Sequence, residues 1–326
     1  MSAPLLDIDD VTVKFGGGVG QGPAFTALEN FTLRIPSDEP QIIAVAGESG
    51  SGKSTMGGVG LGLNRPSAGT VRFQGDDIWG SGMARSTDFR KSVQAIFQDP
   101  FSVFNPFYPV ERLLRIPLRQ FGIAKGRTEQ DELIQDALSK VGLRPEQIIG
   151  RHPHQLSGGQ RQRIVVARAL MLRPKLIVAD EPVSMIDASL RATVLENLRS
   201  LRDDHGISLI YITHDLATAR QVSDRLFVLY RGRAVEEGSA NDVIGDPLHP
   251  YTQLLMNSIP RPDPDAGWEG ETQGDEARGT LSDRSQCVFI DRCPHRMDAC
   301  RRAPSDSFVQ RRRVACHLYD DARVAT

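Results

Sequence analysis

Hydrophobic residues along this chain recur in short runs that are typical of strands, separated by segments with a helical period. Residues Leu5–Val13 alternate apolar with acidic or polar positions, as a half-exposed strand does. Continuous apolar runs are typical of strands that are buried on both faces of a sheet. Further strand candidates occupy Phe31–Ile35, Gln41–Ala46, Lys175–Ala179 and Ile207–Thr213. The last three are continuous runs and are expected to be buried.

Helical patterns lie between these strands. The segment Thr128–Asp131 predicts a capping box at the start of one helix, and Gly142 predicts its end. One face of this helix carries the apolar residues Leu133, Ile134, Ala137, Leu138 and Val141. A second helix is expected from Ala188 to about Arg202. Alternation of strand, loop and helix predicts an α/β fold with a parallel core, whose ligands gather at the carboxyl ends of the strands.

Composition and charge narrow the class of protein. The 326 residues are 40% hydrophobic, which is enough for a buried core. Lys and Arg number 39 against 41 Asp and Glu, and this net charge of −2 offers no basic field to nucleic acid. The apolar runs are far shorter than the ~18 residues that cross a bilayer, and the acidic segment Met1–Asp10 lacks the apolar core of a secretory signal. Four cysteines are too few for a secreted disulfide scaffold, so we expect a cytosolic protein.

A glycine-rich loop follows the run Gln41–Ala46. Its sequence, Gly47-Glu-Ser-Gly-Ser-Gly-Lys53-Ser54, has the spacing GxxxxGK[ST]. Glycines let successive backbone N–H groups curl around an oxyanion, and the N-terminus of the following helix adds partial positive charge. Lys53 is expected to reach the β- and γ-phosphates, and the Ser54 hydroxyl to ligate Mg²⁺. The segment therefore predicts a nucleoside triphosphate site.

Two carboxylates and a histidine are expected near this loop. Asp180 and Glu181 directly follow a buried strand, and His214 follows another. Taken alone, the two carboxylates would be ordinary polar residues at the point where a strand leaves the sheet. A lone histidine is also more often structural than functional. Beside a nucleotide loop, Asp180 is expected to help hold Mg²⁺ through water, and Glu181 to orient or deprotonate the attacking water. His214 is expected to contact the γ-phosphate or that water.

A second glycine motif, Leu156-Ser157-Gly158-Gly159-Gln160, precedes a helix expected over Arg161–Leu172. Ser157 can cap this helix, and the N–H groups of the two glycines then face outward as a further anion site. Alone, the motif could be a helix start and nothing more.

Taken together, these motifs resemble the ABC ATPase family over residues 1 to about 258. The loop is similar to Walker A, Gln98 to the Q-loop glutamine, and LSGGQ to the signature motif. LIVADE is similar to Walker B with its catalytic glutamate, and His214 to the switch histidine. The segment Ser184–Asp187 resembles the D-loop, departing from the commoner Ser-Ala-Leu-Asp but keeping Asp187.

The resemblance implies a P-loop ATPase cassette with a RecA-like α/β core, an antiparallel β subdomain and a helical subdomain at about residues 100–170. The expected boundaries are 1–258 for the ATP-binding domain, 259–286 for an acidic Pro/Gly-rich linker and 287–326 for a small Cys-rich C-terminal domain. The reaction implied is ATP hydrolysis, with Mg²⁺ as the metal.

The resemblance also assigns site residues. Glu181, His214 and Gln98 are implied to be catalytic, and Ser54, Gln98 and Asp180 to hold Mg²⁺. Phe15 matches the aromatic that stacks on adenine, although a residue at a strand end can equally belong to the core. The implied nucleotide contacts are Phe15, Gly47, Glu48, Ser49, Gly50, Ser51, Gly52, Lys53, Ser54, Thr55, Gln98, Ser157, Gly158, Gly159, Gln160, Asp180 and Asp187.

In this family, the signature of one protomer completes the nucleotide site of the other in a head-to-tail dimer. A γ-phosphate that is gripped on one side still presents oxygens to a second helix N-terminus, so the pair closes when the triphosphate is present and opens after hydrolysis. The resemblance therefore implies a partner cassette, either a copy of this chain or a sister subunit.

Two function classes compete: a transporter motor, and a soluble ABC protein of DNA repair or translation. The chain has one cassette, no heptad run and no CxxC pair, which favours the motor. Phe97, Phe101, Phe104, Phe107 and Tyr108 lie within twelve residues beside the Q-loop. They predict either local core packing or a groove that receives a cytoplasmic helix of a membrane subunit.

The segment Asp246–Asp263 resembles the extension of oligopeptide/dipeptide importer subunits. The resemblance implies a peripheral protein on the cytoplasmic face of the cell (inner) membrane. It implies two membrane permeases as partners and, indirectly, an extracytoplasmic substrate-binding protein, with no nucleic acid. This branch also contains nickel and oligosaccharide importers, so nickel and oligosaccharides remain alternatives to a peptide as the transported substrate.

The tail holds all four cysteines, Cys287, Cys293, Cys300 and Cys316. Free thiols or disulfides, a zinc site with His295 or His317 as substitute ligands, and an iron–sulfur cluster are the alternatives. The importer family has a similar tail and is associated with a 4Fe-4S cluster, so the resemblance favours this cofactor over zinc. Arg311–Arg313 is expected to be a solvated face rather than a nucleic-acid or lipid site.

Overall fold

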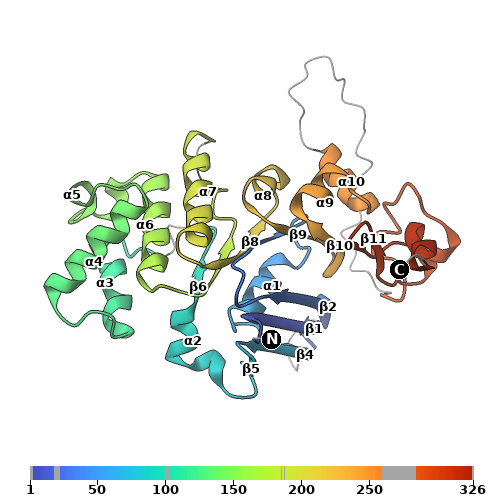
Figure 1. Cartoon of the computed structure of the whole chain (residues 1–326), viewed down its shortest axis with the longest axis horizontal. Coiled ribbons are helices and arrows are strands. Elements are labelled where there is room, and N and C mark those ends of the chain that lie inside the picture. Colours follow the sequence, from blue (N-terminus) through green and yellow to red (C-terminus); the bar gives the residue numbers. More distant parts are fainter. Residues whose placement is uncertain are drawn as a thin grey trace, which may run out of the picture.

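The fold is described from a computed structural model of the whole chain (Figure 1). The structure describes residues 3–17, 23–99, 103–184, 186, 188–258 and 284–324. Residues 259–283 of the expected linker, Asp187 and Phe101 lie outside the described residues.

The centre of the molecule is a parallel sheet. Five strands lie in the order β9-β3-β8-β7-β6 and all run in the same direction. Their bounds are β3 Ile42–Ala46, β6 Val93–Ile96, β7 Leu176–Asp180, β8 Ser208–Thr213 and β9 Arg225–Tyr230. Every residue of β3 and β8 is buried, as the continuous apolar runs predict for strands covered on both faces.

Three antiparallel strands extend this sheet beyond β9. They are β10 (Arg233–Ser239), β12 (Arg312–Val314) and β11 (Ser307–Val309), in that order outward. Glu236 of β10 lies opposite Val314 of β12. The carboxyl-terminal residues therefore continue the central sheet.

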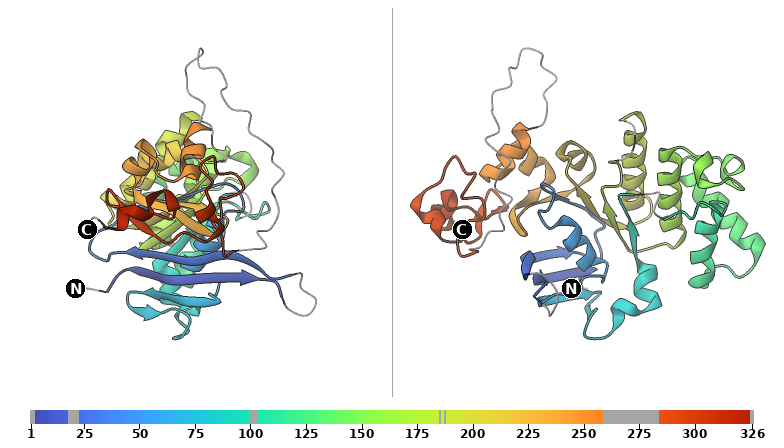
Figure 2. Two further views of the ribbon diagram at one scale, coloured as in Figure 1. Left: turned by 90° about the vertical axis from the view of Figure 1, so that its right-hand side faces the viewer. Right: turned by 180° about the vertical axis from the view of Figure 1, so that it is seen from behind.

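A second sheet is fully antiparallel, in the order β2-β1-β4-β5. Figure 2 shows it as a separate layer along one side of the molecule. Its bounds are β1 Leu6–Phe15, β2 Phe25–Ile35, β4 Ala68–Phe73 and β5 Asp76–Asp77. Apolar side chains of this sheet and of one face of the parallel sheet form a shared core with α1.

The helices fall into two groups (Figure 1). At one end of the molecule lie α3 (Glu111–Gln120), α4 (Arg127–Lys140), α5 (Pro145–Ile148) and α6 (Gly158–Met171). The remaining helices are α1 (Lys53–Gly60), α2 (Thr87–Ser92), α7 (Ala188–Asp203), α8 (Leu216–Val222), α9 (Ala240–Gly245) and α10 (Pro250–Asn257). Short 3₁₀ segments occupy Met83–Arg85, Pro153–Gln155, Asp298–Arg301 and His317–Val324. The α/β class with an antiparallel sheet and a helical part is confirmed, and the exact domain boundaries stay predictions.

One helix start was predicted wrongly. The capping box expected at Thr128–Asp131 does not form, because α4 already begins at Arg127 with Gly126 as its N-cap. Glu129 instead accepts a hydrogen bond from the Lys125 backbone N–H at 3.2 Å. The predicted terminator is confirmed, since Gly142 adopts a left-handed φ of 70° just beyond the helix end.

A buried polar cluster ties the C-terminal strands to the core. Arg312 of β12 is 1% exposed, so the solvated face expected for Arg311–Arg313 is wrong at this position. Its guanidinium donates to the Asp242 carbonyl oxygen at 2.9 Å and to the Asp246 carboxylate at 3.3 Å. It lies 3.8 Å from the carboxylate of Glu236, which also accepts the backbone N–H of His249. Burial raises the pKa of Glu236, and hydrogen bonds oppose that rise.

We expect Arg312→Met to lower the free energy of unfolding by about 3 to 5 kcal/mol, because it leaves the Glu236 carboxylate buried without its cation. Urea unfolding of the whole chain measures this loss. The neighbouring exposed residue provides the control, since Arg311→Met is expected to change stability by less than about 0.5 kcal/mol. Equal effects of the two substitutions would contradict the role given to the buried cluster.

Candidate functional site

The parallel register brings four loops to one edge of the central sheet. Ala46 is paired with Thr213, and Asp180 with Ile212, so β3, β7 and β8 end at nearly the same level. Ile96 at the end of β6 is paired with Ala179. The residues that follow these strands are Gly47, Gln98, Glu181 and His214. Residues from distant parts of the sequence therefore meet at the carboxyl edge, as parallel α/β sheets require.

The glycine-rich loop has a backbone that only glycine allows at its two ends. Gly47 has a φ of 151°, and an added Cβ would lie 2.2 Å from the Leu229 carbonyl oxygen. Gly52, the N-cap of α1, has a φ of 105°, and its Cβ would lie 2.6 Å from the Ala27 carbonyl oxygen. Gly50 also has a left-handed φ of 78° but faces open space. The tight curl of this loop brings its backbone around to the start of α1.

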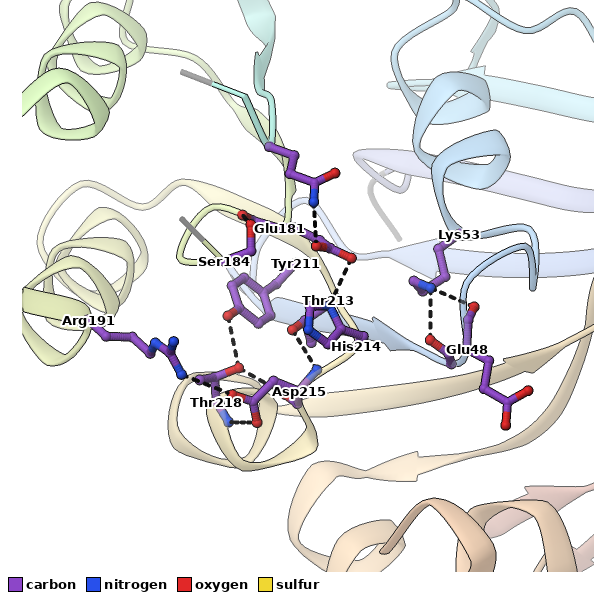
Figure 3. A network of polar contacts seen from close by, with 12 residues as sticks. Glu48, Lys53, Glu181, Ser184, Arg191, Tyr211, Thr213, His214, Asp215 and Thr218 are labelled. Carbon is purple, nitrogen blue, oxygen red and sulfur yellow. Dashed lines mark hydrogen bonds and ion pairs between the residues drawn. The ribbon is translucent and has the colours of Figure 1, made fainter. Parts of the chain in front are cut away.

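Lys53 lies inside the curl of this loop. Its Nζ donates to the carbonyl oxygens of Gly47 and Glu48, each at 2.8 Å (Figure 3). Burial lowers the pKa of Lys53, and the charges of Glu181, Asp180 and Glu48 oppose that shift. The ammonium thus lies near three carboxylates and is held by carbonyl oxygens that a phosphate oxygen can replace.

Ser54 and Asp180 provide hard oxygen ligands beside Lys53. The Ser54 side chain hydrogen-bonds to the Asp180 carboxylate, whose pKa is raised by burial and by the nearby Glu181 charge. A hydroxyl and a carboxylate oxygen are the ligand types that Mg²⁺ prefers, so these residues fit the predicted metal. Among the remaining loop residues, Ser49 is exposed, Thr55 is half-buried, and the buried Ser51 Oγ has no hydrogen-bond partner within the described residues.

Glu181 is held between the two other residues predicted to be catalytic. The Gln98 amide Nε2 donates to one carboxylate oxygen at 2.9 Å, and Nδ1 of His214 lies 3.0 Å from the other (Figure 3). Its backbone N–H donates to the Ile212 carbonyl oxygen, and its carbonyl oxygen accepts from the Ser184 hydroxyl. Glu181 also has a φ of 46°, a strained conformation that is uncommon outside glycine.

The loop that carries His214 is held in place by hydrogen bonds of its two neighbours, Thr213 and Asp215. The Thr213 hydroxyl accepts the Asp215 backbone N–H at 3.0 Å, and Asp215 in turn caps α8 by accepting the N–H groups of Ala217 and Thr218. Arg191 lies 3.5 Å from the Asp215 carboxylate. The His214 side chain itself is 60% exposed, so it remains accessible to a ligand in front of the sheet edge.

Phe15 lies at the end of β1 and is 39% exposed, so it is not a core residue. Its ring centroid is 5.7 Å from that of Phe25, which is also exposed and which the sequence did not point to. Two neighbouring exposed rings offer a stacking surface for a planar group.

The second glycine motif forms the start of α6. Ser157 is the N-cap, and its Oγ accepts the Gln160 backbone N–H at 3.2 Å, which confirms the predicted cap. In turn, the Gln160 side-chain Oε1 accepts the Ser157 backbone N–H, and the two hydrogen bonds together form a capping box. Figures 1 and 2 show α6 in the helical end of the molecule, away from α1. The structure therefore does not bring Ser157, Gly158, Gly159 and Gln160 to the glycine-rich loop of the same chain.

The cysteines do not form a metal site in this arrangement. All four are free thiols, and within the described residues no group of three or more His, Cys, Asp or Glu side chains is placed to hold a metal ion. Burial raises the pKa of Cys316 to about 11, so that thiol stays protonated. His317 has one ring nitrogen at 2.8 Å from Asp320 and the other at 2.9 Å from the Arg302 carbonyl oxygen, so neither is available for zinc. The predicted iron–sulfur cluster is not supported by this geometry.

Two further residues contact the glycine-rich loop and were missed from the sequence. The Tyr251 hydroxyl accepts the Glu48 backbone N–H, and the Arg292 guanidinium pairs with the Glu48 carboxylate. Both lie about two hundred or more positions from the loop, so no local pattern could have indicated the contact.

Among the helices in the described ranges, none is long and apolar enough to cross a membrane. The fold and the site together define a P-loop nucleoside triphosphatase, with its phosphate loop, its carboxylates and its histidine on one sheet edge.

Comparison with known proteins gives the family. Residues 28–184 match the family model of the ABC transporter, and residues 235–300 match that of the oligopeptide/dipeptide transporter C-terminal region. The chain is 41% identical over 298 residues to the oligopeptide transport ATP-binding protein OppF of Salmonella typhimurium, covering 89% of this chain and 88% of that one. It is 36% identical over 324 residues to the putative oligopeptide transport ATP-binding protein YkfD of Bacillus subtilis, covering 98% and 97%.

Among solved structures, the chain is similar to the ATP-binding cassette MJ0796 in a dimeric, post-hydrolysis state with ADP and Pi. The TM-score is 0.64 at 26% identity, over 72% of this chain and 98% of that one. The chain belongs to the ABC transporter ATP-binding proteins, in the oligopeptide/dipeptide group. It is an ATPase of that family.

We expect Gly52→Ala to destabilise the nucleotide-free protein by about 1 to 3 kcal/mol more than Gly50→Ala, because only the Gly52 methyl meets a backbone carbonyl. Both substitutions share the cost of a left-handed residue, so Gly50→Ala is the matched control. Urea unfolding without nucleotide measures the difference. Equal losses would show that the close approach of Gly52 to Ala27 does not constrain the loop.

Proposed function

We propose that this chain is the ATP-hydrolysing subunit of a peptide importer and that the sheet-edge residues are its catalytic site. The observation that carries the proposal is the Glu181 carboxylate, which lies between Gln98 and His214 and near enough to Lys53 for its charge to act on that lysine. Oligopeptides or dipeptides are proposed as the cargo because the C-terminal region matches the transporter family of that name. An oligosaccharide or nickel cargo is the alternative, which uptake assays with the partner permeases distinguish.

The loop and Lys53 bind the triphosphate in this proposal. The Lys53 ammonium exchanges its two carbonyl partners for phosphate oxygens, and the N–H groups at the start of α1 add further donors. Ser54, Asp180 and Gln98 hold Mg²⁺, which when bound neutralises charge on the β- and γ-phosphates. The exposed pair Phe15 and Phe25 takes the adenine.

Glu181 acts on the attacking water. One carboxylate oxygen is fixed by the Gln98 amide, and the other lies against His214, so the group has a defined orientation without any ligand. Glu181 orients the water and accepts its proton, and His214 holds the carboxylate and contacts the γ-phosphate. The strained backbone of Glu181 is tolerated because its N–H and carbonyl group are both hydrogen-bonded.

A second cassette completes the site. The N-terminus of α6 lies away from the loop of its own chain (Figure 1). The first N–H groups of a helix have no partner within it, so this helix start can act on a nucleotide bound by a partner. The similar cassette MJ0796 is described as a dimer with ADP and Pi. Asp187, outside the described residues, is assigned to the nucleotide contacts by the family resemblance.

Membrane permeases are the proposed partners on the cytoplasmic side of the cell membrane, and a substrate-binding protein would deliver the cargo to them from the other side. Phe97, Phe107 and Tyr108 are 45%, 84% and 40% exposed, whereas Phe104 is buried in the core. Of the four aromatic residues in this group that the structure describes, only Phe104 is accounted for by local packing. The three exposed rings beside Gln98 supply an apolar surface for a cytoplasmic helix of a permease.

We expect Glu181→Gln to reduce ATP turnover by about 100-fold or more while ATP binding is retained, because the amide cannot accept the proton of the water. Phosphate release and equilibrium ATP binding, measured on the same preparation, separate the two effects. Glu196→Gln, on the exposed face of α7, serves as the charge-matched control. Turnover close to that of the unchanged chain would remove Glu181 from the mechanism.

The family resemblance also leads us to propose a 4Fe-4S cluster on Cys287, Cys293, Cys300 and Cys316. The support is that burial first, and then the charges of the other three cysteines, raise the pKa of Cys316, and a bound cation would offset this rise. Binding requires the thiols to come closer together than in the structure described here.

Anaerobically purified chain is expected to contain about four iron and four sulfide per protomer. Elemental analysis with inorganic sulfide determination measures both. Stoichiometric zinc without sulfide would replace the cluster by a zinc site, and absence of both metals would leave the cysteines as free thiols.

A further inference from the structure

The C-terminal segment reaches the phosphate loop through one ion pair. The guanidinium Nη1 and Nη2 of Arg292 lie 2.8 and 3.0 Å from the two carboxylate oxygens of Glu48. This geometry is bidentate, which makes it directional as well as attractive. The Glu48 hydrogen bonds raise the pKa of Arg292 further above its ordinary value. The pair joins positions 244 residues apart, so it is a tertiary contact between the C-terminal segment and the loop.

The pair is supported by a cluster of aromatic side chains. Tyr251, which accepts the Glu48 backbone N–H at 2.8 Å, has its ring centroid 4.4 Å from Tyr230 and 5.5 Å from Phe289. The Arg292 guanidinium carbon lies 5.8 Å from the ring centroids of both Tyr230 and Phe289. Tyr251 and Phe289 are fully buried. The backbone and the side chain of Glu48 are therefore both anchored on one rigid surface.

The charge of Glu48 matters because of its place in the loop. Its carbonyl oxygen accepts from Lys53, and its carboxylate is one of the three charges that act on that lysine. Without a cationic partner to hold it, the Glu48 carboxylate could turn toward the loop and repel a triphosphate there. Figure 3 shows the Glu48 side chain directed away from Lys53, toward the side opposite the ammonium.

We propose that Arg292 is a positioning residue for the nucleotide site, which holds the Glu48 carboxylate away from the phosphates and cancels its charge, so that the C-terminal segment sets the affinity of the loop for ATP. This inference rests on the proposed nucleotide site. Because coupling between two sites is reciprocal, bound nucleotide must also stabilise the C-terminal segment. Arg292 itself does not touch the reacting atoms and is not a catalytic residue.

The first test compares ATP affinity with turnover. Arg292→Ala is expected to raise the Kd for ATP by about 3- to 10-fold, the range of a partly exposed bidentate pair. At saturating ATP, kcat is expected to stay within about twofold, because Glu181 is untouched. Arg301→Ala is the control, since Arg301 lies in the same segment and pairs only loosely with Asp298 at 3.8 Å. An unchanged Kd in Arg292→Ala would overturn the proposal.

A double variant tests whether the effect passes through Glu48. In Arg292→Ala combined with Glu48→Gln, the repelling carboxylate is gone, and the Kd is expected to return to within about twofold of the unchanged chain. If the Kd rises equally in both backgrounds, Arg292 acts by another route and the proposal fails. Should Arg292→Ala not fold, Arg292→Lys keeps the charge without the bidentate geometry and is expected to give a smaller rise in Kd.

Hydrogen exchange separates coupling from a purely structural role of Arg292, because a purely structural role would not make amide exchange in the C-terminal segment depend on nucleotide. A non-hydrolysable ATP analogue is expected to slow amide exchange in residues 284–300 of the unchanged chain, and this slowing is expected to be lost in Arg292→Ala. No slowing in the unchanged chain would contradict the coupling. Lys53→Ala separates this inference from the function on which it rests. If the unchanged chain binds ATP no better than Lys53→Ala, the nucleotide site itself is wrong, whereas tight binding with no effect of Arg292 refutes the inference alone.

Discussion

Parallel pairing of β3, β7 and β8 is the constraint on which the site depends. Since these strands run in one direction and end at nearly the same level, the residues after them are forced to one edge of the sheet. Lys53, Glu181 and His214 come together for that reason, although more than 150 positions separate the first from the last. The buried runs that hold the strands in register thus also position the chemistry.

Several charged side chains lie at this edge of the sheet, in an arrangement that suits a polyanion bound together with a divalent cation. Lys53 is bonded to loop carbonyl oxygens, and the Asp180 carboxyl has a raised pKa because it is buried beside another carboxylate. Glu181 is oriented by Gln98 and His214 and has a strained backbone conformation. A phosphate would offer Lys53 anionic oxygens in place of the loop carbonyl oxygens, and its magnesium ion would place a cation beside the carboxylates, which is why the site favours a nucleotide over a neutral ligand.

The local parts of this picture could be predicted from the sequence, and the long-range parts could not. Continuous apolar runs located the buried strands, and Gly47–Ser54 located the phosphate loop, because both signals are contained in a few adjacent residues. The capping box at Thr128–Asp131 does not form because α4 already begins at Arg127, with Gly126 as its N-cap. Tyr251 and Arg292 were missed, since their contact with the loop depends on where the chain returns after more than two hundred residues.

The C-terminal residues are joined to the ATP-binding part by direct contacts. Strand β12 extends the central sheet, and Arg292 pairs with Glu48 of the phosphate loop. The proposed catalytic site nevertheless depends on the binding of a triphosphate by the loop at Gly47–Ser54. Titration calorimetry with ATP under non-hydrolysing conditions tests this binding directly, on the unchanged chain and on Lys53→Ala. We expect one ATP per chain and a clear loss of affinity in the variant. Equal affinity of the two chains for ATP would contradict the binding of the triphosphate by this loop.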